Sequence, residues 1–241
     1  MQKESYRKLL FISIFAAAMA FLEATVVIYL RKIYYPDGFA FPLKGFIEPQ
    51  ILSIEWVREI GTIVMLVCIG ILAGKKAYEK LAYFLYAFAV WDIFYYVWLK
   101  LTLSWPQSVF TPDLLFLIPW PWVGPVLAPV ICSLTMAVLA IVIINFGEKR
   151  KIILNTLEWA FLIAGSLIIL YTFLIDYYRF LTNGGFLKDF FTLAQNKEFI
   201  DKIGMFSPLN YNWIIFGIGE LVILVGIFIF YRRLLKGMKS Y

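Results

Sequence analysis

The chain has 241 residues, of which 62% are hydrophobic and 16% are charged, and its mean hydropathy is +0.81. Soluble domains carry about 25% charged residues, so this composition excludes a soluble protein and predicts an integral membrane protein. The formal net charge of +6 requires no nucleic-acid partner, because basic residues at the ends of membrane spans explain it.

The composition also excludes several kinds of catalytic and cofactor site. Because the chain has no histidine, it cannot form His-ligated haem sites, His-containing zinc sites or His general bases. Cys68 and Cys132 lie inside apolar runs, which is typical of small core residues and not of a disulfide or a thiolate metal site. We therefore expect neither a metal nor a cofactor.

Six apolar stretches follow one another along the chain, each long enough to cross about 30 Å of hydrocarbon as an α-helix. The first is too long for the apolar core of a signal peptide, so it is interpreted as an uncleaved span. The predicted fold is an all-α integral membrane protein, a six-helix bundle in one polytopic domain over residues 1–241. The predicted spans are residues 9–30, 51–74, 81–101, 123–146, 154–178 and 211–231.

The connection before the fourth span is rich in proline and tryptophan, from Ser104 to Pro129. Its segment Thr111–Ile118 can begin a short helix, with Thr111 as the N-cap. The prolines that follow force extended backbone, so we expect a short interfacial or re-entrant element. The alternative is an aromatic belt at the membrane interface. If this element is a gate, the candidate gate residues are Pro119, Pro121, Gly124 and Pro125.

The connection between the fifth and sixth spans contains a second short element, within Phe186–Phe206. Apolar residues recur there at helical spacing against charged ones, which predicts an amphipathic helix. That helix would lie on the outer membrane surface or pack over the bundle as a lid.

The distribution of basic residues predicts the orientation of the bundle. With the N-terminus inside, the short inner segments hold 13 Lys and Arg residues, and the much longer outer segments hold 8. Since cytoplasmic segments are enriched in these residues, both termini are predicted to be cytoplasmic, in a multi-pass protein of the cell (inner) membrane.

The second span begins with a polar stripe, because Glu55, Arg58, Glu59 and Thr62 are spaced i, i+3, i+4 and i+7. Arg58 can pair with either neighbouring glutamate. We also expect Arg58 to pair with a carboxylate of another span, either Glu23 or Asp92. Arg58 is the only base that lies firmly inside a predicted span.

Further acids lie in other spans, and the predicted topology places nearly all of them in the middle or outer half of the membrane. Each would cost about 2.5–3.5 kcal/mol or more if it faced lipid, so we expect them to share a polar chamber with aromatic walls. Some of the carboxylates would then be protonated or bind a cation. The candidate pocket and ion-binding residues are Glu23, Glu55, Arg58, Glu59, Asp92, Glu220, Trp91, Tyr95 and Tyr96. The alternative is that these groups only hold the helices together.

Three functions fit this pattern. The first is a small-solute, ion or proton-coupled carrier, which would use the acids to bind protons or cations. The second is a membrane-embedded enzyme that acts on a lipid-like or isoprenoid substrate by carboxylic acid and base catalysis. The third is a non-catalytic accessory subunit of a larger membrane complex. The expected partners are membrane lipids, a lipid-like or cationic small ligand and other membrane proteins, with no nucleic acid.

Overall fold

The computed structural model describes residues 3–42, 49–148, 152–187 and 196–236. In these residues six helices are long and apolar enough to cross a membrane, which confirms the all-α membrane bundle predicted from the sequence. Each predicted span overlaps one of them. The long helices are α1 (Lys3–Tyr34), α2 (Pro49–Ala73), α3 (Ala77–Leu103), α4 (Leu127–Gly147), α5 (Thr156–Asn183) and α7 (Trp213–Lys236).

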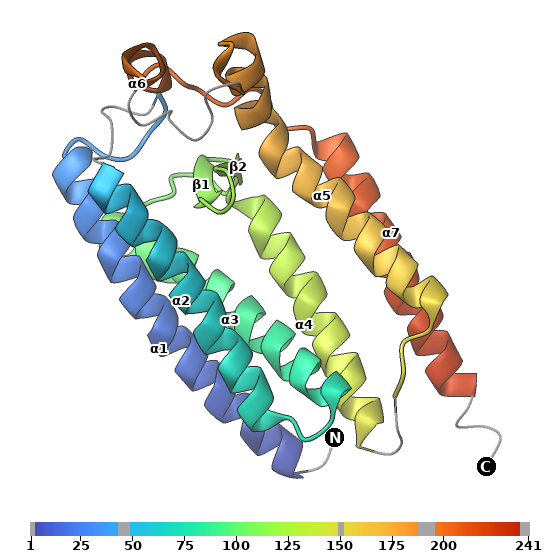
Figure 1. Ribbon diagram of the computed structural model, residues 1–241. Coiled ribbons are helices and arrows are strands. Elements are labelled where there is room, and N and C mark those ends of the chain that lie inside the picture. The colour runs from blue at the N-terminus through green and yellow to red at the C-terminus, as the bar shows by residue number, and fades with distance from the viewer. Residues whose placement is uncertain (1–2, 43–48, 149–151, 188–195, 237–241) are drawn as a thin grey trace.

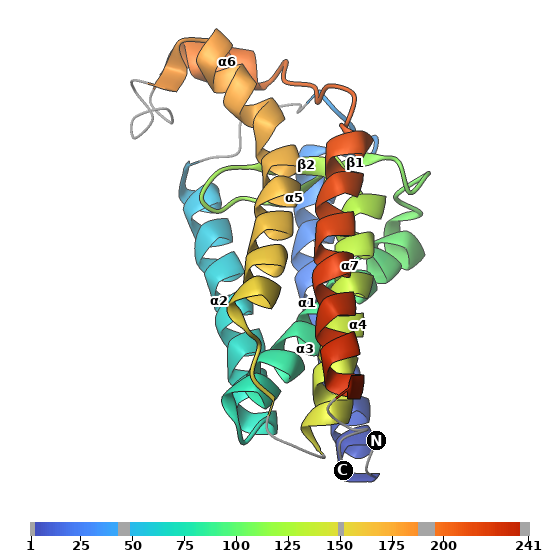
Figure 2. The same cartoon turned by 90° about the vertical axis from the view of Figure 1, so that its right-hand side faces the viewer.

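The long helices form two groups that α4 joins (Figure 1). Helix α3 packs against α1, α2 and α4, whereas α5 pairs with α7, and α4 also contacts α7. The first turn of α1 and the last turn of α7 lie at one end of the bundle, which we call the terminal end (Figures 1 and 2). The short elements lie at the opposite end, which we call the distal end.

The half of the bundle nearer the terminal end has an apolar core. Leu9 and Ile12 of α1 belong to the same buried cluster as Ile143 of α4 and Phe230 of α7, and each is at most 7% exposed. Burial of such side chains stabilises the bundle by about 1.5–3 kcal/mol each relative to exposure in water. In a membrane, close packing of the side chains provides much of the stabilisation instead. This apolar core fills the bundle below the distal end.

Helices α5 and α7 approach each other closely at two glycines. A Cβ atom on Gly165 would lie 2.7 Å from the Gly219 carbonyl oxygen, and one on Gly219 would lie 3.0 Å from the Gly165 carbonyl oxygen. Small residues at such crossings let the backbones of membrane helices come into contact. The pairing of α5 with α7 therefore depends on these two positions.

The proline-rich connection between α3 and α4 forms a β-hairpin, so the prediction of a short helix over Thr111–Ile118 is wrong. Strand β1 (Pro112–Phe116) pairs antiparallel with β2 (Trp122–Pro125). The Thr111 hydroxyl accepts a hydrogen bond from the Ser108 N–H at 3.2 Å instead of capping a helix. Asp113 accepts a hydrogen bond from Arg31 of α1 at 2.7 Å. Long-range contacts thus outweigh the local helix signal.

The four candidate gate residues all lie in this hairpin. Pro119 and Pro121 lie in the turn between the strands, while Gly124 and Pro125 lie in β2. A Cβ atom on Gly124 would lie 3.0 Å from the ring of Phe173 in α5. The hairpin therefore fits closely between α4 and α5, and a gating role for it stays a prediction.

The connection between α5 and α7 contains a short helix, α6 (Lys197–Ile203), at the distal end (Figure 2). Residues 188–195 of the predicted amphipathic stretch, which include Phe190 and Phe191, lie outside the described residues. In the described part, Phe199 is 6% exposed and packs with Tyr177 and Leu181 of α5. This segment faces the bundle, as expected of a lid.

Candidate functional site

A cavity of about 240 Å³ opens at the distal end of the bundle. Its walls come from α1, α2, α3 and the hairpin, and α6 covers part of it. Among the described residues, five carboxyl side chains and two arginines line it, and we call it the chamber. These charged residues are Glu23, Glu55, Glu59, Asp92, Asp113, Arg31 and Arg58.

Arg58 lies at the centre of an ion-pair cluster in the chamber. Its Nε and Nη2 atoms donate to Glu55 Oε2 at 3.0 and 2.6 Å, and its Nη1 atom forms an ion pair with Glu23 of α1. The Thr62 hydroxyl donates to the other oxygen of Glu23 at 2.9 Å. The predicted polar stripe is confirmed, and of the partners that the sequence left open Arg58 pairs with Glu55 on its own helix and with Glu23 on another.

Glu59, the second acid of the stripe, accepts hydrogen bonds from the hairpin. The backbone N–H of Leu117 donates to both of its carboxylate oxygens at 3.0 Å. Among the described residues Glu59 forms no ion pair, although it is only 6% exposed. It therefore connects α2 to the hairpin, and it does not share the ion pair that joins Arg58 to Glu55 and Glu23.

Asp92 of α3 lies where the chamber meets a second cavity. The Ser133 hydroxyl of α4 donates to it at 2.8 Å, and the described residues provide no ion pair for it. The second cavity, of about 530 Å³, runs between α3, α4 and α5 and is lined mainly by apolar side chains. We call it the apolar groove. In the part of the chain that the structure describes, four residues line both cavities: Trp91, Asp92, Leu115 and Phe116.

Glu220 is the candidate acid that does not reach the chamber. It lines the apolar groove, where the Thr135 hydroxyl of α4 donates to its Oε2 atom at 2.8 Å. Helix α7 packs against α5 and α4, so an acid on α7 at a similar depth faces a different cavity. Asp176 of α5 also stays outside the chamber and accepts a hydrogen bond from the Leu209 N–H at 3.0 Å.

Sequence reasoning missed the Arg31–Asp113 pair. Arg31 is 7% exposed and Asp113 is fully buried, and the guanidinium carbon lies 4.3 Å from the ring centre of Phe39 and 3.8 Å from that of Trp105. Arg58 is therefore not the only embedded base, which corrects the expectation. Arg31 is the first of two adjacent basic residues that follow an apolar run. An arginine at such a position fits an exposed loop as well as a buried site. No signal in the sequence marks its burial.

Aromatic rings cover much of the chamber wall. Trp91 and Tyr95 stack with their ring centres 6.3 Å apart, and Tyr95 meets Tyr96 edge to face at 5.1 Å. Phe199 and Phe206 line the chamber from the α6 side. Such faces attract cations and pack well against planar or unsaturated groups. The predicted aromatic walls are thus present, and α6 adds rings that the sequence alone did not assign to them.

Apart from Arg58 Nη1, which forms an ion pair with Glu23, two buried nitrogen atoms in the chamber wall have no hydrogen-bond acceptor among the described residues. They are Nη1 of Arg31 and Nε1 of Trp91. Buried polar atoms in native proteins are nearly always hydrogen-bonded. The two nitrogens therefore favour a ligand that brings polar acceptor atoms into the chamber. Within the described ranges no group of three or more Cys, Asp or Glu residues is placed to hold a metal ion.

Comparisons with family models, with curated protein sequences and with solved structures find no match for this chain.

Proposed function

We propose that this protein is a membrane-embedded enzyme that acts on a lipid-like or isoprenoid substrate by carboxylic acid and base catalysis. The observation that carries the proposal is the wall shared by the two cavities, in which Asp92 lies beside Trp91 and Phe116. An amphipathic molecule can place its polar end in the charged chamber and its chain in the apolar groove. The part of the molecule between them then lies next to Asp92.

The chemistry proposed for Asp92 is proton transfer to a carbon–carbon double bond. In its neutral form the carboxyl group gives its proton to one carbon, and the π electron pair becomes the new C–H bond. The positive charge on the neighbouring carbon faces the rings of Trp91 and Tyr95. A carboxylate, for which we propose Glu59, removes a proton from an adjacent carbon, and that C–H electron pair forms the new double bond. The net reaction is an isomerisation that moves the double bond along the chain.

The apolar core below the chamber supports an enzyme over a carrier of polar solutes. Leu9, Ile12 and Ile143 fill the space between the chamber and the terminal end. A polar solute on that route would lose its hydration without compensating hydrogen bonds. A lipid-like substrate needs no such route, because it can enter the apolar groove from the bilayer.

Deuterium labelling tests the proposal for any unsaturated lipid that the protein accepts. The purified protein is reconstituted with lipid extracted from its own membrane and incubated in D₂O, and the lipids are then analysed by mass spectrometry. We expect a lipid species that carries deuterium on carbon, which back-exchange in H₂O does not remove. Asp92→Asn should abolish the label, because an amide cannot supply the proton.

The control variant for this experiment is Glu198→Gln, which removes an exposed acid paired with Lys202 on α6. It should label lipid as the wild type does. If no lipid gains carbon-bound deuterium above the level in protein-free membranes, the enzyme proposal is wrong. Equal labelling by wild type and Asp92→Asn would exclude Asp92 as the acid.

A proton-coupled or cation carrier is the second candidate, and the charge balance of the chamber favours it. Five carboxyl groups face two arginines among the described lining residues, so some carboxyl groups must be protonated or bind a cation. Proteoliposomes with a pH-sensitive dye inside would report proton uptake. The carrier would be favoured over the enzyme by two results together. The wild type takes up protons and Glu59→Gln does not, and no lipid gains carbon-bound deuterium.

We further propose that both termini are cytoplasmic, as the basic residues predict, so that the chamber opens toward the outer side of a cell membrane. A cysteine placed at Asn183, the last residue of α5, should react with an impermeant thiol reagent in intact cells. Absence of labelling there, with labelling after the membrane is permeabilised, would reverse the orientation.

A further inference from the structure

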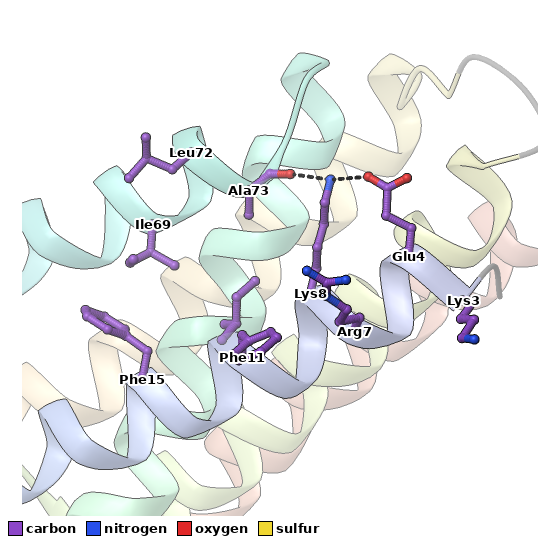
Figure 3. Close-up of a pocket in the computed structure, with 10 residues that line it drawn as sticks. Lys3, Glu4, Arg7, Lys8, Phe11, Phe15, Ile69, Leu72 and Ala73 are labelled. Carbon is purple, nitrogen blue, oxygen red and sulfur yellow. Dashed lines mark hydrogen bonds and ion pairs between the residues drawn. The ribbon is translucent and has the colours of Figure 1, made fainter.

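A third cavity lies at the terminal end, between the first turns of α1 and the last turns of α2 (Figure 3). It is a groove of about 830 Å³, and none of its described lining residues also lines the chamber or the apolar groove. We call it the terminal groove. Its lining residues are Lys3, Glu4, Arg7, Lys8, Phe11, Ile12, Phe15, Ile69, Leu72 and Ala73.

The charged side chains of the terminal groove differ in whether they form ion pairs. The Lys8 Nζ atom donates to the Ala73 carbonyl oxygen at 3.0 Å and lies 3.4 Å from a Glu4 carboxylate oxygen (Figure 3). Lys3 and Arg7 form no ion pair with any described residue. The groove thus combines three basic residues with one acid, and the acid is already paired.

The apolar side chains lie deeper along the same two helices. Phe15 of α1 and Ile69 of α2 lie further from the start of α1 than the charged groups do (Figure 3). Phe15 is 39% exposed and Leu72 is 81% exposed, so the groove continues into apolar surface that faces the bilayer. The order of charged groups followed by apolar groups matches the order in a phospholipid.

We propose that the terminal groove binds an anionic phospholipid of the leaflet at the terminal end. The phosphate would lie between Lys3 and Arg7, and an acyl chain would pack along Phe15, Ile69 and Leu72. Basic pockets between membrane helices bind anionic head groups, and the long basic side chains can reach the head groups while their stems cover apolar surface. The apolar side chains of the groove favour a lipid over a free anion, because a free anion would make no contact with them.

A lipid titration with a matched pair of arginine variants tests the proposal. Arg7 has its guanidinium carbon 6.0 Å from the ring centre of Phe11 on α1, and Arg232 has its own 5.7 Å from that of Phe228 on α7. Both arginines lie in a terminal-end segment four residues from their phenylalanine, but Arg232 does not line the terminal groove. Arg7→Gln and Arg232→Gln therefore remove equal charge at two different places.

The measurement is the thermal unfolding midpoint of the full-length protein in neutral detergent, titrated with dioleoylphosphatidylglycerol or dioleoylphosphatidylcholine. A lipid that binds only the folded state raises the midpoint, and the rise grows with the logarithm of 1 + [lipid]/Kd. We expect the anionic lipid to raise the midpoint more than the zwitterionic lipid. Arg7→Gln should weaken the apparent affinity for the anionic lipid about fivefold, while Arg232→Gln should leave it unchanged.

Three results would overturn the proposal. The first is an equal response to both lipids, and the second is an equal loss of affinity in the two arginine variants, which would indicate diffuse surface charge. The third is an equal rise of the midpoint with inorganic phosphate alone, which would indicate a site for a free anion. Because both variants change surface side chains, their midpoints without lipid serve as the control for folding.

Discussion

The bundle holds an arginine–glutamate cluster at each end, and the two clusters differ in what surrounds them. At the terminal end, Arg233 of α7 donates from Nε and Nη2 to the two oxygens of Glu158 at 2.6 and 2.8 Å. Glu158 also accepts from the Asn155 N–H at 2.9 Å, so both carboxylate oxygens are bonded. At the distal end, Arg58 binds Glu55 and Glu23 in a cavity that holds further acids.

This difference separates an ion pair that joins helices from one that belongs to a site. Glu158 and Arg233 line neither the chamber, the apolar groove nor the terminal groove, and their bonds connect α5 to α7. The Arg58 cluster has the same chemistry but adjoins Glu59 and Asp92, which form no ion pair with any described residue. Buried ion pairs alone are therefore weak indicators of function, whereas surplus acid beside a cavity is a stronger one.

The largest effect on stability is expected from Arg58→Leu. This change leaves Glu23 and Glu55 without their cation, and both are largely buried. Loss of one partner of a buried pair costs about 3–5 kcal/mol of unfolding free energy. Denaturant unfolding of the protein in detergent would measure the loss, and an unchanged free energy of unfolding would show that water already solvates the Arg58 cluster.

A smaller effect is expected from Arg233→Leu, which breaks the other cluster. The Arg233 side chain is 43% exposed, so water can reach this site and replace part of the hydrogen bonding that the buried Glu158 loses. We expect a loss of about 1–3 kcal/mol in the free energy of unfolding, with lipid labelling in D₂O as in the wild type. A variant that stays folded but no longer labels lipid would contradict the separation of the two clusters.

Asp92→Asn and Glu220→Gln form a matched pair, because each acid accepts a bond from an α4 hydroxyl at 2.8 Å. The amide oxygens can keep these bonds, so both variants should stay within about 1 kcal/mol of the wild type in unfolding free energy. Only Asp92→Asn should abolish lipid labelling, since Glu220 lies away from the chamber. Loss of labelling in both variants would assign the chemistry to the apolar groove as well.

Glu59→Gln should also have a small effect on stability. A glutamine oxygen can still accept the hydrogen bond from the Leu117 N–H, while a neutral acceptor forms a weaker bond than a carboxylate. We expect a change of about 0.5–1.5 kcal/mol in unfolding free energy, together with a large loss of lipid labelling if Glu59 removes the proton. Normal labelling would transfer that role to another carboxylate of the chamber.

The sequence by itself determined the features that depend on neighbouring residues. Apolar runs of sufficient length predict membrane spans because the hydrocarbon thickness sets the length of a helix. The spacing of Glu55, Arg58 and Thr62 places them on one helix face because the α-helix has 3.6 residues per turn. The depth of an acid follows in the same way from its position along a span, which is why the sequence predicts most of the chamber acids.

Only the tertiary structure decided which faces and loops meet. Arg31 and Asp113 are 82 positions apart. They pair in a segment that forms a hairpin, although the local sequence after Thr111 favours a helix. Glu220 lies at a depth similar to that of other acids but faces the apolar groove, because α7 packs against α5 and α4. Depth is a property of one helix, whereas the rotation and the neighbours of that helix depend on contacts between distant segments. No local pattern encodes those contacts.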